Sequence, residues 1–451
     1  MFQVLAAPAL RALPSPPPIP VSFYLKFNAQ PMRPLSVFLA SAALSCNAQL
    51  SPWPQTWALN KSTIIMACNY SGDLDPAATG NFSIVDVDWS SGKNEWAKER
   101  PMQADASLIR QALAVAAAVP GRRVFTYRNA IMALPWFADA RAKLEDPAYA
   151  AWFVPFGPPT VNSSSWHVPP CDHNYAPPLC SHLYHGQVQT PSYPGVCAAP
   201  ACDCGGVPCG EYVFDFRAAN TSVRGRTFAE WYVEDYFFGP TALGHPNISG
   251  LYVDDLWSDV SGPSEMDPHA VRDMGLSPAD VADMAAAYRW MLQRASAVVA
   301  ARGKWTWSMF LNNDPFQKAN GGCPQPWVKQ ATCAADLRAL CNASAPPQSR
   351  TLLYGFAPGC PGIDPAHIPA PEHDIANFQL VRGPFAFLGT GWQGCSPQLT
   401  YEYPPELNSD FGEPAGLCAE APSGSGTFVR EFSRATVKMD CTTWTPTIGW
   451  K

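Results

Sequence analysis

The segment Asn247-Ile-Ser-Gly-Leu-Tyr-Val-Asp-Asp-Leu-Trp-Ser258 places a short apolar run, Leu251 to Val253, directly before two carboxylates and a tryptophan. As a β-strand, this run would carry both acids to its C-terminal end. In a (β/α)8 barrel the carboxyl ends of the strands form the active site. A carboxylate pair beside an aromatic ring is also typical of sites that cleave sugars.

Similar apolar runs recur along the chain, and most are separated by helical segments. Ser277 is a good N-cap for a long amphipathic helix that ends near Arg302, and residues 107–119 form an Ala-rich helix. The alternation predicts a parallel sheet, and the number of strands predicts a closed (β/α)8 TIM barrel over residues 62–448. The connection between the first two strands, residues 71–81, does not fit this alternation, because it is too short for an ordinary helix. The eight predicted strands span residues 63–70, 82–89, 123–128, 211–217, 249–256, 304–311, 350–356 and 384–389.

Two segments depart from the alternation. Residues 155–210 are rich in Pro, Cys, His and Gly without periodicity, and they predict a long Cys-rich loop insertion on the active-site side. Its Cys and His are the residue types that bind zinc, but the spacing fits no tandem CxxC pattern, which favours disulfides. His173 or His185 is a further candidate to reach the substrate. Residues 426–441 alternate like a β-hairpin, predicted to pack on the outer surface of the barrel.

The N-terminal region predicts secretion. Residues 32–48 have a basic start, a short apolar run and small residues, as a signal peptide does, and residues 1–31 form a Pro-rich, disordered extension. Removal of Cys46 with the signal leaves fourteen of the fifteen cysteines, an even number that suits seven disulfides. Asn-x-Ser sequons fit a secreted glycoprotein and begin at Asn60, Asn69, Asn81, Asn162, Asn220, Asn247 and Asn342.

Charge and hydropathy exclude other classes of partner. The net charge is −7 and no basic run is present, which argues against nucleic acid. No later apolar run is long enough to predict a membrane span. The chain lacks GxSxG, P-loop and HExxH motifs, and no cofactor is predicted.

Three predicted strands end in carboxylates, which form the candidate site. They are Asp86 and Asp88, Asp215, and Asp254. Strand alternation points Asp254 into the barrel mouth and Asp255 aside, where it would orient a neighbour or bind at the rim. The plain structural alternative is that these acids form ion pairs with Arg128 or Arg217. The candidates for substrate binding are Asp86, Trp89, Arg128, Arg217 and Trp257.

The predicted chemistry is cleavage of a glycosidic bond in an extracellular or cell-wall polysaccharide. One carboxyl would protonate the leaving oxygen, and another would act as nucleophile or as base for water. Asp254 is assigned one role, and Asp88, Asp215 and Asp255 remain open for the other. Glu265 is a further acid candidate. The alternatives are a non-catalytic carbohydrate-binding protein on the same scaffold and a zinc-dependent hydrolase that uses the insertion.

Three segments also carry a resemblance: residues 81–90, residues 202–215 and Gly250-Leu-Tyr-Val-Asp-Asp-Leu-Trp-Ser258. They resemble a group of secreted eukaryotic proteins that is in turn similar to TIM-barrel glycosyl hydrolases. Residues 411–416, 430–432 and 435–437 look like the closing segment of such barrels, so the resemblance covers about residues 62–448.

The resemblance implies roles for particular acids. It makes Asp254 and Asp255 the catalytic-strand acids and Asp88 and Asp215 cleft residues, and it places Glu413 in a turn. The group tends to have His where this chain has Phe216, so any role of that His is missing here.

Overall fold

The computed structural model describes residues 55–157, 210–264, 269–307, 330–341, 371–384 and 403–451, with shorter pieces at 183–184, 186, 188–190, 196–197, 207–208, 266, 328, 352–356, 386–392 and 395. The chain divides into two units, Met1–Asn47 and Ala48–Lys451. The predicted extension 1–31 and signal peptide 32–48 lie outside the described residues, as does most of the insertion 155–210. The fold below is that of the second unit.

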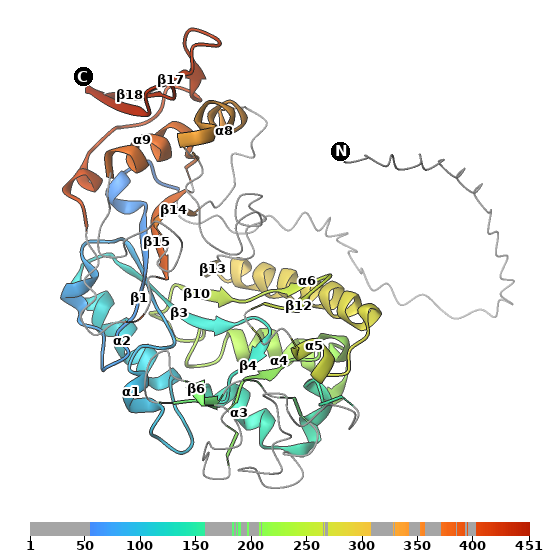
Figure 1. Ribbon diagram of the computed structural model, residues 1–451. Helices are drawn as coiled ribbons and strands as arrows, with labels where there is room; N and C mark the ends of the chain where they lie inside the picture. Colours follow the sequence, from blue (N-terminus) through green and yellow to red (C-terminus); the bar gives the residue numbers. More distant parts are fainter. Residues whose placement is uncertain are drawn as a thin grey trace, which may run out of the picture. The chain divides into compact units, whose positions relative to one another are not determined.

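Seven parallel strands form one open, curled sheet (Figure 1). Every strand except β14 lies beside its predecessor in the chain, and the last strand, β15, also pairs with the first, β1. The sheet is open between β13 and β14, so the predicted closed barrel is seen here only as an open parallel sheet. In chain order the strands are β1 (Thr63–Ala67), β2 (Ile84–Val87), β3 (Arg123–Asn129), β10 (Gly250–Asp254), β13 (Trp305–Trp307), β14 (Leu352–Phe356) and β15 (Phe387–Trp392).

The predicted strand over residues 211–217 is wrong. Within this segment the strand is limited to Tyr212–Val213 (β7), which pairs antiparallel with Met132–Ala133 (β4), outside the main sheet. The chain then turns at Asp215, which caps the short 3-10 helix η6 (Phe216–Ala218). Phe214 and Phe216 look like part of a buried strand face, but both rings pack on the π-helix, and Phe216 also packs on Tyr288 of α6.

Helices occupy most of the predicted crossovers, and Figure 1 shows α6 beside β10 and β13. The predicted long helix is confirmed as α6, which Ser277 opens with a capping box. The connection before β2 holds only the 3-10 turn η2 (Pro76–Thr79). In the described part of the chain no helix is long and apolar enough to cross a membrane. The helices are α1 (Lys93–Trp96), α2 (Asp105–Ala118), α3 (Ala138–Leu144), α4 (Phe228–Trp231) continued by the π-helix η7 (Tyr232–Phe237), α5 (Ala270–Asp273), α6 (Pro278–Ala301), α8 (Cys333–Leu340) and α9 (Pro371–Val381).

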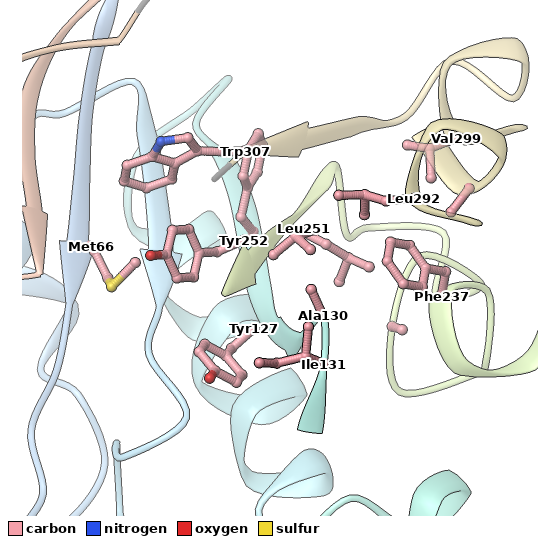
Figure 2. Close-up of a cluster of buried hydrophobic side chains, with 14 of the residues drawn as sticks. Met66, Tyr127, Ala130, Ile131, Phe237, Leu251, Tyr252, Leu292, Val299 and Trp307 are labelled. Atoms are coloured by element: carbon pink, nitrogen blue, oxygen red, sulfur yellow. The ribbon is translucent and has the colours of Figure 1, made fainter. Parts of the chain in front are cut away.

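The two faces of the sheet differ in chemistry (Figure 2). Leu251 points toward Leu292 and Val299 of α6 and belongs to the apolar layer under the helices. Tyr252 and its register partners Tyr127 and Trp307 lie on the opposite face, on the side of Met66. Because alternate residues of a strand face opposite sides, Asp254 shares the face of Tyr252.

The C-terminal segment forms a second, antiparallel sheet. Its order is β16 (Ala419–Glu420), β17 (Thr427–Glu431), β18 (Ala435–Asp440) and β19 (Thr445–Trp450). The predicted hairpin corresponds to β17 and β18 and is confirmed, while β19 was not predicted. Disulfides Cys333–Cys441 and Cys341–Cys418 join it to α8, and Cys68–Cys395 joins the end of β1 to the segment after β15. The prediction of seven bridges concerns the whole chain, and these three lie in its described part.

Candidate functional site

Three carboxyl groups meet at the carboxyl ends of β2 and β10. Asp86 lies on β2, Asp88 follows that strand directly, and Asp254 is the last residue of β10. The strands flank β3, and the charges interact: Asp254 raises the pKa of both other acids, in each case after the larger effect of burial. The structure therefore brings together three of the predicted site residues.

Asp254 is held by three hydrogen-bond donors. Its Oδ2 accepts a bond from the Tyr127 hydroxyl at 2.7 Å, and its Oδ1 accepts bonds from the Tyr252 hydroxyl at 3.1 Å and the Asp255 amide at 2.9 Å. Burial raises the pKa of Asp254, and these three donors oppose the rise because they stabilise the carboxylate. The residue is half-buried, so it keeps some access to solvent.

Asp88 is more deeply buried, with 3% of its surface exposed. Its Oδ1 accepts a bond from the Ser90 amide at 2.8 Å. Burial raises the pKa of Asp88 to about 7, and the charge of Asp254 adds to the rise. Asp88 can therefore hold a proton near neutral pH, as a general acid must.

Asp86 lies completely buried on the same face of β2 as Asp88. Neither of its carboxyl oxygens has a hydrogen-bond partner of normal geometry among the described residues. Burial first, and then the charges of Asp88 and Asp254, raise the pKa of Asp86 well above its usual range. An isolated buried charge is very costly, so this environment favours the neutral acid form of Asp86.

Asp255 turns away from this group because its backbone adopts a left-handed conformation, with φ 63°. It is fully buried. Its Oδ2 accepts a bond from Asn129 Nδ2, and its Oδ1 accepts one from the Ser264 hydroxyl, both at 2.6 Å. Asn129 Nδ2 also donates to the Tyr127 hydroxyl at 3.0 Å. Asp255 is thereby linked, through Asn129 and Tyr127, to Asp254.

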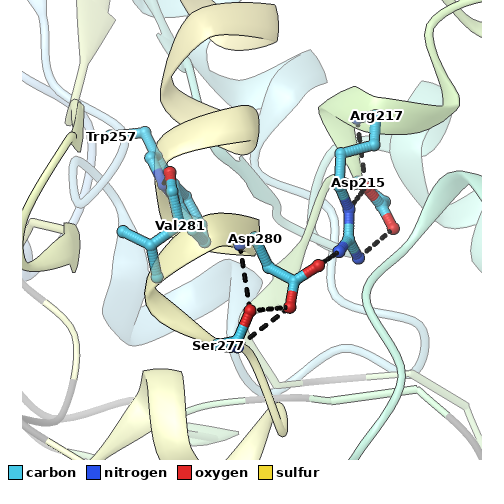
Figure 3. Close-up of polar contacts among 6 residues, drawn as sticks. All are labelled: Asp215, Arg217, Trp257, Ser277, Asp280 and Val281. Carbon is cyan, nitrogen blue, oxygen red and sulfur yellow. Dashed lines mark hydrogen bonds and ion pairs between the residues drawn. The ribbon is translucent and has the colours of Figure 1, made fainter.

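Asp215 is engaged elsewhere (Figure 3). Its carboxylate accepts two bonds from Arg217, and Arg217 also pairs with Asp280 in the first turn of α6. The predicted position of Asp215 at a strand end is wrong, because η6 begins there instead. For this acid the ion-pair alternative is what the structure shows.

Two predicted substrate-binding residues have structural contacts. Trp257 is 2% exposed, and its indole N–H donates to the Val281 carbonyl at 2.9 Å, so the ring packs under α6 (Figure 3). Arg128 is fully buried and donates to the carbonyls of Tyr236 and Thr241, which ties β3 to the segment around η7. Neither side chain is exposed to a substrate in this conformation.

Trp89 differs from Trp257 because it is only half-buried. Its ring stacks on Trp136 with centroids 5.0 Å apart, and Lys93 Nζ lies 5.6 Å from its centroid. Trp89 directly follows Asp88, so an aromatic surface borders the acids. It remains the candidate for stacking on a sugar ring.

A second polar group borders the site and was not predicted. Lys93 Nζ donates to Gln189 Oε1, and Gln189 Nε2 donates to Glu211 Oε1, both at 2.8 Å. Burial lowers the pKa of Lys93 to about 8 and raises that of Glu211 to about 7. Asp88 and Lys93 also interact electrostatically. Glu211 opens the segment that was predicted as a strand, and no periodic signal marks it as a neighbour of Lys93.

Tyr127, Asn129 and Tyr252 were also missed as site residues. All three lie on the face that carries Asp254, at alternating positions of β3 and β10. The same alternation that selects Asp254 also selects these side chains, but Tyr and Asn carry no charge that marks them in the sequence as partners of a carboxylate. Glu265, His173 and His185 lie outside the described residues.

The part of the chain that the structure describes holds no group of three or more His, Cys, Asp or Glu placed to bind a metal. Comparison with known protein families and with curated proteins finds no match for this sequence. The chemistry of the site is therefore argued from the side chains above.

Proposed function

We propose that this protein is a secreted glycoside hydrolase on a (β/α)8 barrel, with Asp88 as general acid and Asp254 as nucleophile or base. The observation that carries the proposal is the different environment of these two interacting carboxyls. Asp88 is 3% exposed, has a pKa of about 7 and takes its hydrogen bonds from the adjacent residues Trp89 and Ser90. Asp254 is half-buried and accepts bonds from two tyrosine hydroxyls and the Asp255 amide. Glycosidases separate the two roles in the same way, by environment.

The strand order supports the barrel. The first and last strands in chain order, β1 and β15, are neighbours, as they are in a closed barrel. The sheet is open between β13 and β14. The chain between these strands includes residues 308–327 and 342–351, which lie outside the described part. In a closed barrel, Asp88 and Asp254 would lie at the mouth, where active sites of this fold are found.

Secretion is supported by the disulfides. Bridges such as Cys68–Cys395 persist in oxidising compartments and are rare in the cytosol. Trp89, half-buried next to Asp88, supports a polysaccharide as substrate, because sugar rings stack on aromatic surfaces.

A non-catalytic carbohydrate-binding protein is the second candidate. It is favoured by the burial of Asp88, because an acid that is 3% exposed must gain access to the glycosidic oxygen before it can protonate it.

A hydrolysis screen separates the two candidates. The full chain, purified from a host that forms disulfides, is incubated with a panel of cell-wall and matrix polysaccharides, beside Asp254→Asn and Asp88→Asn. The matched control is Asp259→Asn, an exposed acid on the segment after β10 that pairs with Arg289. Cleavage lost in both site variants and kept in the control supports the hydrolase. Binding of a polysaccharide without cleavage by the parent protein supports the second candidate.

The pH profile gives a further test of the roles. If Asp88 is the general acid, kcat/KM falls as the pH rises through about 7, because the acid loses its proton. Activity that stays constant from pH 6 to pH 9 would contradict that role.

A further inference from the structure

Asp254 belongs to a series of side-chain hydrogen bonds that runs through Tyr127, Asn129 and Asp255 to Ser264. Backbone amides that donate to Asn129 and to Ser264 determine which atoms of this series donate and which accept. Asn129 Oδ1 accepts bonds from the backbone amides of Ile131 at 3.0 Å and Met132 at 2.7 Å. Backbone N–H groups only donate, so the atom that faces them must be the side-chain oxygen. The amide nitrogen of Asn129 must therefore face Tyr127 and Asp255.

This orientation determines where the proton of Tyr127 lies. The amide nitrogen of Asn129 has two hydrogens, which go to the Tyr127 hydroxyl at 3.0 Å and to Asp255 Oδ2 at 2.6 Å. Since Tyr127 accepts from Asn129, its own hydrogen is directed to Asp254 Oδ2 at 2.7 Å. Burial, and then the charge of Asp254, raise the pKa of Tyr127 well above its usual range, so the hydroxyl keeps its proton.

The direction of the hydrogen bond between Ser264 and Asp255 is determined in the same way. The Leu256 amide donates to the Ser264 hydroxyl at 2.9 Å, so the Ser264 hydrogen is directed to Asp255 Oδ1 at 2.6 Å. Asp255 thus accepts a bond on each carboxyl oxygen and acts as a carboxylate acceptor. It fixes the second hydrogen of Asn129 and completes the orientation of that amide.

We infer that Asn129 is a positioning residue: acting through Tyr127, it keeps a donor on Asp254 and makes Asp254 the ionised carboxyl of the cluster. Asp86 has no hydrogen-bond partner of normal geometry for either carboxyl oxygen among the described residues, and Asp88 takes its hydrogen bonds from the adjacent residues Trp89 and Ser90, with no tyrosine hydroxyl among them. The inference deepens the proposed function and rests on it for its catalytic meaning, since only an ionised Asp254 can serve as nucleophile or base. The titratable groups that act on Asp254 or contact it are Asp86, Asp88, Tyr127, Tyr252, Asp255 and Tyr288.

The test measures the titration of Asp254 directly. Carboxyl resonances of protein labelled with 13C-aspartate are followed against pH, and the Asp254 signal is assigned by its loss in Asp254→Asn. Tyr127→Phe removes the donor, so the Asp254 titration is expected to move to higher pH. Asn129→Ala is expected to move it in the same direction.

A matched control separates this effect from general loosening. Tyr232→Phe removes another buried hydroxyl, which donates to the Ala130 carbonyl at 2.7 Å and contacts no carboxylate among the described residues. It should leave the Asp254 titration unchanged. An equal movement in Tyr232→Phe would overturn the inference.

A double-variant cycle tests whether Asn129 acts through Tyr127. In the Tyr127→Phe background, Asn129→Ala should shift the Asp254 titration no further, because the Tyr127 hydroxyl through which Asn129 acts is already absent. Full additivity would overturn the inference, as would an unchanged titration in both single variants. If Asn129→Ala does not fold, Asn129→Ser replaces it, since its hydroxyl can still accept from one of the two backbone amides.

The readout distinguishes the inference from the proposed function because it requires no substrate. A titration that moves as expected in a protein that cleaves no polysaccharide would uphold the inference and refute the hydrolase. Cleavage with an unchanged titration would do the reverse. If both hold, the acid limb of kcat/KM should move to higher pH in Tyr127→Phe.

Discussion

Asp88→Asn is expected to stabilise the folded protein at pH 8 and to have almost no effect at pH 4. Burial raises the pKa of Asp88 from its ordinary value of 3.8 to about 7. This rise of about three pKa units corresponds to about 4 kcal/mol, at about 1.36 kcal/mol for each pKa unit. This free energy is the cost of keeping an ionised Asp88 in the fold.

The sign follows from proton binding. Because the folded state holds the proton of Asp88 up to about pH 7 and the unfolded chain only up to about pH 3.8, stability falls as the pH rises between these values. An amide has no charge to bury, and its oxygen can keep the bond from the Ser90 amide. Asp88→Asn should therefore raise the free energy of unfolding by up to about 4 kcal/mol at pH 8. It also removes a charge that raises the pKa of Asp86, which adds to the gain.

Urea denaturation followed by tryptophan fluorescence at pH 4 and pH 8 measures the effect. Asp259→Asn is the control, since a substitution of an exposed residue changes stability by about 0.5 kcal/mol or less at either pH. A loss of stability in Asp88→Asn at pH 8, or the same change at both pH values, would refute the reasoning. A gain in stability with loss of hydrolysis would instead identify Asp88 as a group whose burial serves the site at the expense of stability.

Two further substitutions probe the frame of the site. Asp255→Gly should be less destabilising than Asp255→Ala by about 1 kcal/mol in urea denaturation, because both lose the same hydrogen bonds but only glycine adopts φ 63° without strain; equal losses would contradict a strained backbone there. Cys68→Ser should lower the free energy of unfolding by about 2–5 kcal/mol through loss of the bridge to Cys395. Cys395→Ser, and the double variant, should then lose the same amount, and additive losses would show that the two cysteines act separately.

The sheet could be predicted because most of its strands are short apolar runs separated by helices with clear ends. Helix α6 begins after Ser277 and ends near Arg302 as predicted, since the hydroxyl cap of Ser277 and the left-handed Gly303 are strong local signals. The segment 211–217 failed because its alternating aromatic residues satisfy the period of a strand. Phe214 and Phe216 are instead buried against the π-helix, and Phe216 also against α6; both helices lie outside this segment, so no pattern within it contains that information.

Part of the site could be predicted from alternation alone. Once residues 249–256 are taken as a strand, the pleat places Asp254 and Tyr252 on one face, and the same argument applies to Asp86 and Asp88. The partners of these acids could not be predicted, because they depend on strand order. Tyr127 reaches Asp254 only because β3 lies between β2 and β10, and this order is decided by the packing of the whole sheet.

The two adjacent acids that end β10 illustrate how one strand end can supply two different groups. Asp254 follows the pleat and stays with the acid cluster, where three donors hold it. Asp255 leaves the pleat at φ 63°, which ends the strand and turns its carboxylate toward Asn129 and Ser264. A strained residue persists only where its surroundings determine it, and here the two hydrogen bonds and full burial do so. The strain is therefore what allows Asp255, the immediate neighbour of Asp254, to orient the side chain that in turn orients the donor on Asp254.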